Sequence, residues 1–297
     1  MVRRGTYSIV ARDEQTGELG AAVESHWFSV GSIVTWARPG VGAVCTQSIA
    51  EPAYGSRLLD ALAGGTAPAD ALRALLDGDD AARFRQVAAI GTDGPPAVWT
   101  GDGCIAFAGH ASGDDFSAQA NMMASEDVWP AMAEAFARAT GPLARRLLGA
   151  LRAAEGAGGD ARGRQSAAVV VVPASGEPWE RTVDLRVEDH DEPLDELGRL
   201  LTLHDAYTLA TRGDDLTGAG RHAEAGEAYR AAAALAPGNH ELLFWAGLAE
   251  FDHGDRATGL QQLRTAIAMQ PGWRELMARL EPDVAPAAAR ALAALDQ

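Results

Sequence analysis

The C-terminal third of the chain repeats itself with a period of 34 residues. Residues 206–239 and 240–273 align on their prolines, Pro237 and Pro271. The alignment also matches small residues with small ones and large apolar residues with each other: Gly213 with Gly247, Ala225 with Gly259, Tyr229 with Leu263, and Ala232 with Ala266. Small residues let two helices approach closely, and a proline ends a helix. Each repeat is therefore predicted to form a helical hairpin.

The order of these residues and the 34-residue period are typical of the tetratricopeptide repeat. About three such repeats are usually needed for stability, so these two should rest on the rest of the chain, on a cap or on another subunit. We therefore expect the repeat helices to bind a protein partner or a second copy of the chain, which predicts a homo-oligomer. Tyr229 and Leu263 should be buried at equivalent positions. The predicted helices cover residues 206–217 with 221–235, 239–252 with 256–269, and a capping helix over 284–295.

Residues 1–203 show a different pattern, in which blocks of strands alternate with pairs of helices. Strand-like runs occur at 6–12 and 19–25, and a second pair follows at 32–37 and 40–48. The run "SAAVVVV" has no polar alternation, which predicts a strand covered on both faces. Helices are predicted over 52–65, 68–76, 126–139, 142–154 and 192–203.

This order favours an α+β fold with two sheets stacked face to face and helices outside each, a four-layer αββα sandwich. Periodicity alone leaves open a single sheet with helices on both faces. The domain boundaries are accordingly predicted as 1–203 for the sandwich and 204–297 for an all-α domain of two repeats and a capping helix.

The charge balance excludes some classes of partner. Arginine supplies all 25 basic side chains, and the net charge is −16. Binding to nucleic acid or to an anionic membrane surface needs a basic face, so neither partner is expected. The longest apolar runs are far shorter than a membrane span of about 20 residues, and Cys45 and Cys104 lack the spacing of a zinc site or a disulfide framework. We expect a cytoplasmic protein with no metal and no cofactor.

Polar residues gather in the loop "GGDARGRQ", just before the buried strand. Asp160, Arg162, Arg164 and Gln165 lie there, and loops at the mouth of a sheet often carry function. An arginine in this loop could clamp a substrate carboxylate with two parallel hydrogen bonds. The alternative is a solvated turn in which the aspartate and an arginine pair with each other.

Further candidates lie at strand ends. Ser25 and His26 end one strand, and Ser48 ends another. Ser48 could be a nucleophile with His26 as its base, but no nucleophile-elbow pattern surrounds it. Asn121 could donate to a developing oxyanion or be a turn residue. The acidic stretch at 188–191 invites a metal site, although an acidic turn before a helix explains it more simply.

Thr6 opens the first strand and raises the central question. A hydroxyl is a weak nucleophile that needs a base, and a threonine at a chain terminus carries one, its own α-amine. Gly5 precedes Thr6 and would leave an uncrowded peptide bond for cleavage. Glu24 and Asp13 are the nearest acidic residues in sequence that could support an exposed Thr6.

The stretches "TYSIVARDEQTGELGAAVES", "VGSIVTWARPGVGAVCTQS", "PAYGSRLLDALAGG", "CIAFAGHASGDDFSAQANMMA" and "GGDARGRQSAAVVVV" occur in order. Together with the segment up to residue 203 they resemble the domain of unknown function 1028. The resemblance implies an N-terminal-nucleophile-hydrolase-like αββα sandwich, in which Met removal commonly exposes the threonine that matches Thr6. Here five residues precede Thr6, so either the Gly5–Thr6 bond is cut or the amine stays blocked. The extension favours the uncut chain.

Three functional hypotheses follow. The first is an amide hydrolase that uses Thr6, helped by Glu24 and Asn121, on a small molecule with a carboxylate or an amide. Its substrate would contact Ser25, His26, Ser48 and the loop residues Asp160, Arg162, Arg164 and Gln165. The second is a domain of the same fold that binds a small ligand without catalysis. The third is a scaffold that acts through its repeat helices.

Overall fold

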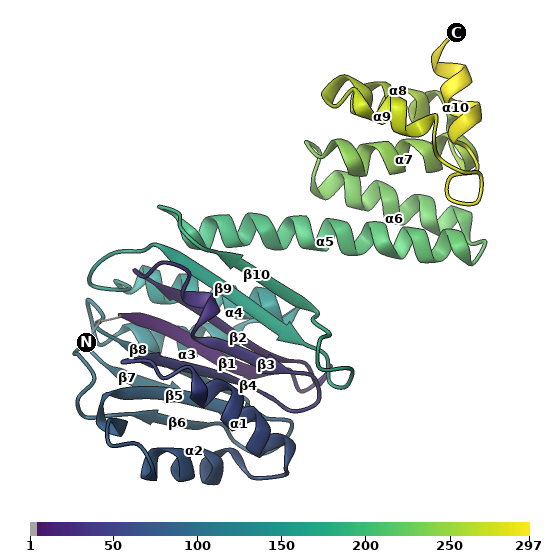
Figure 1. Ribbon diagram of the computed structural model, residues 1–297. Helices are drawn as coiled ribbons and strands as arrows, with labels where there is room; N and C mark the ends of the chain where they lie inside the picture. The colour runs from purple at the N-terminus through teal and green to yellow at the C-terminus, as the bar shows by residue number, and fades with distance from the viewer. Residues whose placement is uncertain (1–4) are drawn as a thin grey trace. The chain divides into compact units, whose positions relative to one another are not determined.

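The computed structural model describes residues 5–297, and the contacts within it divide the chain into two units, Met1–Arg199 and Leu200–Gln297. The boundary lies inside one long helix, α5 (Pro193–Gly218) (Figure 1). Two separate helices over 192–203 and 206–217 were predicted, and they are continuous because residues 199–212 contain neither proline nor glycine to end the first one. No helix in residues 5–297 is long and apolar enough to cross a membrane.

The first unit contains two antiparallel sheets. The six-stranded sheet has the order β10-β9-β2-β1-β8-β7, and the four-stranded sheet has the order β3-β4-β5-β6. The strands of the first sheet are β1 (Thr6–Arg12), β2 (Leu19–Ser25), β7 (Gly109–Ser112), β8 (Phe116–Asn121), β9 (Ser166–Val172) and β10 (Val183–Val187). Those of the second are β3 (Thr35–Arg38), β4 (Gly42–Ser48), β5 (Arg85–Gly91) and β6 (Ala97–Thr100).

The two sheets share one apolar core. Val10, Val23 and Val170 of the larger sheet belong to the same buried cluster as Cys45 and Ile90 of the smaller one. Helices α1 (Ala53–Ala63) and α2 (Pro68–Asp77) pack on the smaller sheet through a second cluster. Helices α3 (Val128–Arg138) and α4 (Leu143–Gly156) contact strands of the larger sheet (Figure 1). A single sheet with helices on both faces, the alternative left open by the sequence, is not what the first unit contains.

Most predicted strands of this unit are confirmed. The strands at 6–12 and 19–25 have the predicted bounds, and every residue of β9 is buried, as its unbroken apolar run indicated. Strand β7 was not predicted. Its sequence "GHAS" is half exposed at a sheet edge and lacks the β-branched and aromatic residues that mark strands.

The second unit is helical. Two hairpins repeat the same contact: an added Cβ at Gly213 would lie 2.6 Å from the Tyr229 ring, and one at Gly247 would lie 3.0 Å from Leu263. Tyr229 and Leu263 are both buried, as predicted. The capping helix begins four residues later than predicted because Pro286 disfavours helical backbone at the residue before it. The helices are α6 (His222–Leu235), α7 (His240–His253), α8 (Arg256–Met269), the unpredicted short α9 (Gly272–Met277) and α10 (Ala288–Leu295).

Candidate functional site

Thr6 is the first residue of β1 and is completely buried. Its backbone pairs with Asn121 of β8 on one side. On the other side the register of β1 and β2 brings its side chain to Ser25, with 3.2 Å between the two hydroxyl oxygens. Alternation along the strand directs both hydroxyls to the face of the sheet that carries Val10 and Val23, the face between the two sheets.

The carbonyl oxygen of Gly5 is the focus of the hydrogen bonds around Thr6. It lies 2.6 Å from the Thr6 hydroxyl and also accepts a hydrogen bond from the Ser25 hydroxyl. The Nη2 group of Arg162 donates to the same oxygen at 2.8 Å. Since donors placed around a carbonyl oxygen stabilise negative charge that develops on it, the Gly5–Thr6 peptide bond is polarised and has a hydroxyl beside it.

Arg162 is held in place by Asp160. The guanidinium bonds to both oxygens of this carboxylate, at 3.0 Å from Nε and 2.7 Å from Nη2. The backbone N–H groups of Arg162 and His26 donate to the same carboxylate. The pairing of aspartate with arginine that the sequence left as an alternative is therefore present, and the same arginine also reaches Gly5.

A network of side-chain amides lies between the sheets under Thr6. Gln47 and Asn121 both donate to the backbone oxygen of Thr6, at 3.2 and 3.4 Å, and both donate to the side-chain oxygen of Gln86. The oxygens of the Gln47 and Asn121 amides are buried without a hydrogen-bond partner among the described residues. The sequence placed Gln47 at the end of a strand without giving it a role, and Gln86 was missed. Alternation along the strands could have revealed both residues. Gln47 lies on the same face of β4 as Cys45, and Gln86 lies on the same face of β5 as Ala88, where apolar residues are expected.

Glu24 does not face Thr6, contrary to its predicted role. Glu24 pairs with Tyr7 in the β1–β2 register, so its side chain lies on the opposite face of the sheet from the Thr6 hydroxyl. The Tyr7 hydroxyl bonds to Glu155 at 2.7 Å, and both oxygens of Glu24 are buried beneath the sheet. Burial is the main cause that raises the pKa of Glu24 well above its ordinary value, and the nearby carboxylates of Glu155 and Asp160 add to the rise.

The remaining acidic candidate, Asp13, is also remote. Asp13 follows the far end of β1 and forms an ion pair with Arg146 at 2.9 Å. Hydrogen bonds from the Thr16 and Gln15 backbone, together with Arg146, lower the pKa of Asp13 against the opposing effect of burial. Neither acidic residue suggested by the sequence can therefore act directly on Thr6.

Of the other predicted site residues, Arg164 and His26 lie near each other but bond to groups other than Thr6. Arg164 is engaged by Glu155 at 3.0 Å and by Glu192. The Nδ1 atom of the His26 ring lies 3.3 Å from the Arg164 backbone oxygen. Ser48 ends β4 with a left-handed φ of 71°.

The acidic stretch at 188–191 forms a surface turn. Gln165 donates to Asp189 at 3.0 Å, and the His190 ring accepts from the Glu192 backbone. Among residues 5–297, no group of three or more His, Cys, Asp or Glu side chains could hold a metal ion. Both cysteines are free, and burial raises the pKa of Cys45 to about 12.

Comparison with known proteins gives two matches and one negative result. Residues 6–197 match a family described as "Family of unknown function (DUF1028)". The first unit also resembles the crystal structure of a DUF1028 protein from Silicibacter pomeroyi, with 33% identity and a TM-score of 0.61 over 66% of this chain and 88% of that one. No curated protein matches the chain.

Proposed function

Because the chain belongs to the DUF1028 family, whose function is unknown, we propose a function from the geometry at Gly5 and Thr6. The chain is an amide hydrolase of the N-terminal-nucleophile type, and its nucleophile is Thr6 after cleavage of the Gly5–Thr6 bond. One observation carries the proposal: the Gly5 carbonyl oxygen is held by Arg162 and Ser25 beside the Thr6 hydroxyl. Two facing sheets with helices on their outer faces agree with the αββα sandwich of such hydrolases.

The proposed cleavage is a self-processing reaction. The Thr6 oxygen adds to the Gly5 carbonyl carbon, and negative charge develops on the oxygen that Arg162 and Ser25 already contact. The hydroxyl proton passes to the Thr6 nitrogen as the C–N bond breaks, which leaves an ester between Gly5 and Thr6. Water then hydrolyses the ester, and the products are a Gly5 carboxylate and a Thr6 residue with a free amine and a free hydroxyl.

The cleaved chain would carry its own general base. An α-amine has a pKa of about 8, so a useful fraction is neutral at pH 7 to 8 and can accept the Thr6 hydroxyl proton. The acyl carbonyl of a small amide substrate would take the place that the Gly5 carbonyl occupies, with Arg162 and Ser25 as its donors. Asn121 and Gln47 hold the Thr6 backbone oxygen and are positioning residues in this mechanism.

The test is the intact mass of the purified protein, compared between wild type and two variants. Wild type should lose residues 1–5, and Thr6→Ala should keep them because it has no hydroxyl to attack Gly5. Thr46→Ala is the matched control, since Thr46 is also a buried strand threonine but bonds to Glu51. An uncut wild-type chain, or a cut Thr6→Ala chain, would overturn the self-processing mechanism.

A second candidate function is a ligand-binding module on the same fold. It applies if the Gly5–Thr6 bond stays intact, because an uncut chain leaves the Thr6 nitrogen in a peptide bond with no base to offer. In that case the protein binds a small molecule and turns nothing over. The intact mass separates this candidate from the hydrolase.

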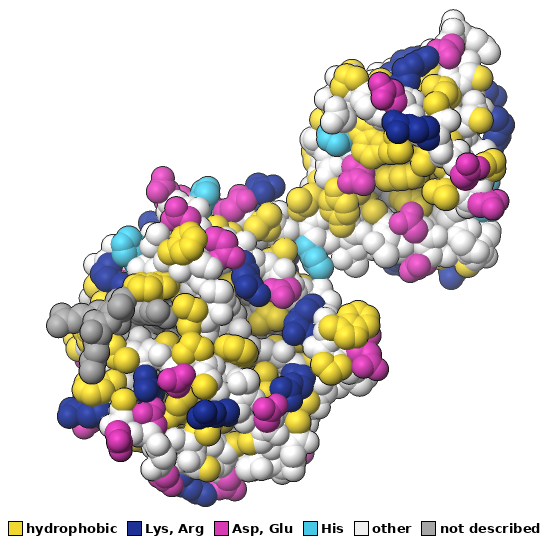
Figure 2. Space-filling model, viewed as in Figure 1, with side chains coloured by type: hydrophobic (Ala, Val, Ile, Leu, Met, Phe, Trp, Pro, Cys, Tyr) yellow, Lys and Arg dark blue, Asp and Glu magenta, His cyan; other side chains and the backbone are white. Residues whose placement is uncertain are grey.

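For the second unit, we infer tetratricopeptide-type hairpins that bind a protein partner or a second copy of the chain. The equivalent Gly213–Tyr229 and Gly247–Leu263 contacts support the repeat assignment. Apolar side chains gather on the face of this unit shown in Figure 2. A hollow of about 80 Å³ between α6, α7 and the segment before α10 is lined by Trp245, Leu248 and Val284 among others.

A further inference from the structure

Three large apolar side chains are exposed in the loops next to Thr6. Phe28 is 62% exposed, Phe107 is 42% exposed and Ile105 is 36% exposed; we call these three residues the apolar collar. Large apolar side chains that gather in the open at one place mark a binding surface more often than single ones do.

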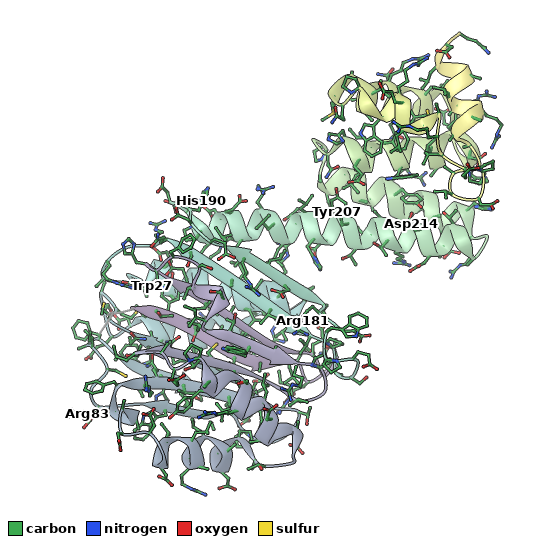
Figure 3. The ribbon with its side chains drawn as sticks, viewed as in Figure 1. Trp27, Arg83, Arg181, His190, Tyr207 and Asp214 are labelled. Atoms are coloured by element: carbon green, nitrogen blue, oxygen red, sulfur yellow. The ribbon has the colours of Figure 1, made fainter. Side chains whose placement is uncertain are left out.

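Hydrogen bonds fix both loops of the collar close to the site. The backbone oxygens of Ile105 and Phe107 accept from Met122 and Met123, the two residues that follow Asn121, the strand partner of Thr6. Phe28 lies two residues after His26, whose N–H donates to Asp160. Both apolar loops are therefore attached to residues next to the site, and Trp27, next to Phe28, marks this end of the sheet in Figure 3.

The charges around the site disfavour an anionic ligand. The guanidinium of Arg162 is paired with Asp160, and that of Arg164 is paired with Glu155 and Glu192. The backbone oxygen of Glu188 accepts from Ser29, which places the acidic segment 188–192 beside the Phe28 loop. A substrate carboxylate would therefore lie near carboxylates of the protein, while both nearby guanidinium groups are already engaged in ion pairs.

The contact between Gly5 and Asp160 limits the shape of an acyl group. A Cβ at Gly5 would lie 2.7 to 2.9 Å from three atoms of the Asp160 carboxyl group, which is itself held by Arg162 and His26. An acyl group that replaces Gly5 is therefore restricted to an unbranched carbon next to its carbonyl.

From these observations we infer that the substrate is the amide of an uncharged, linear acyl group whose apolar chain lies against the collar. This inference rests on the proposed hydrolase, since the acyl group takes the place of Gly5. It differs from the carboxylate-bearing substrate expected from the sequence, because both arginines of that expectation are occupied.

The first experiment measures kcat/KM of the chain that begins at Thr6 with three 4-nitroanilides. The hexanoyl compound should exceed both the succinyl and the 2,2-dimethylhexanoyl compounds by at least about tenfold, and Phe28→Ser and Phe107→Ser should each reduce its turnover by about tenfold. Trp179→Ser is the matched control: Trp179 is 75% exposed but lies in the β9–β10 connection, at the opposite end of the sheet. A higher kcat/KM for the succinyl compound, or an unchanged kcat/KM in the Phe28 and Phe107 variants, would refute this inference and leave the proposed hydrolase intact.

The second experiment does not depend on cleavage. The neutral dye N-phenyl-1-naphthylamine is titrated into the full chain and displaced with hexanamide or with succinamate. Both phenylalanine variants should weaken dye binding by about tenfold, Trp179→Ser should not, and hexanamide should compete where succinamate does not. This result without any hydrolysis would refute the proposed hydrolase and leave an apolar ligand site. Equal loss in the Trp179 control, or no dye binding, would refute the collar.

Discussion

At the scale of single residues, Gly5 and Asp160 fit together so closely that a methyl group is excluded. In Gly5→Ala the added Cβ would press on a carboxylate that cannot turn away, because Arg162 and His26 hold it. We expect a loss of about 1–3 kcal/mol in the free energy of unfolding, typical of overpacking, and slower cleavage at Thr6. Denaturant unfolding and intact mass measure the two effects.

Gly149→Ala is the control for this substitution. Gly149 lies inside α4 with nothing within 4 Å of an added Cβ, so alanine there should raise stability by its better helix propensity, about 0.5–1 kcal/mol. Equal behaviour of the two variants would show that Asp160 does not confine Gly5.

The buried carboxyl group of Glu24 predicts a pH dependence of stability. The pKa of Glu24 is raised by burial, so above its ordinary value near 4.5 the folded chain binds more protons than the unfolded chain. Stability should therefore fall as pH rises from that value to the raised pKa. Glu24→Gln cannot ionise, and its Tm should exceed that of wild type at pH 7 but not at pH 4. The exposed Glu14→Gln should show no such difference, and a Tm gap of equal size at both pH values would contradict the prediction.

At the scale of elements, the strands were predictable and their register was not. Local sequence located these three strands: β9 is an unbroken apolar run, and β1 and β2 are two short runs on either side of a turn. Which side chains share a face depends on the pairing of Tyr7 with Glu24, a long-range fact that no local pattern contains. For that reason the sequence could name Thr6, Ser25 and the Asp160 loop as residues at strand ends, but it could not show that Glu24 lies on the opposite face of the sheet, and Gln86 was overlooked.

The repeated glycine contact gives a prediction for the helical hairpins. In Gly213→Ala the new Cβ would lie 2.6 Å from the Tyr229 ring, so the hairpin must separate or the ring must move. We expect a loss of about 1–3 kcal/mol from overpacking, measured by far-UV circular dichroism in denaturant. Gly218→Ala in the same helix meets nothing within 4 Å and should not be destabilising. Equal free energies of unfolding for the two variants would contradict the close contact between Gly213 and Tyr229.

At the scale of the whole molecule, charge is the dominant property. The net charge of −16 comes without any lysine, and arginines near the candidate site are already paired with carboxylates. Binding to duplex DNA or RNA at about 0.15 M salt should be undetectable, since few cations remain to displace counterions. Fluorescence anisotropy with labelled duplexes measures this, and micromolar affinity for either duplex would contradict it.

The hydrogen bond from Arg162 to Gly5 joins residues that are 157 positions apart in the chain. A ribosome must therefore complete almost all of the first unit, and that unit must fold, before the carbonyl of Gly5 acquires its guanidinium donor. Cleavage that depends on this donor would follow the formation of the sheets and could not precede it. The nascent chain would keep its threonine blocked until the first unit has been synthesised and has folded, and a free Thr6 amine would report that the folding of this unit is complete.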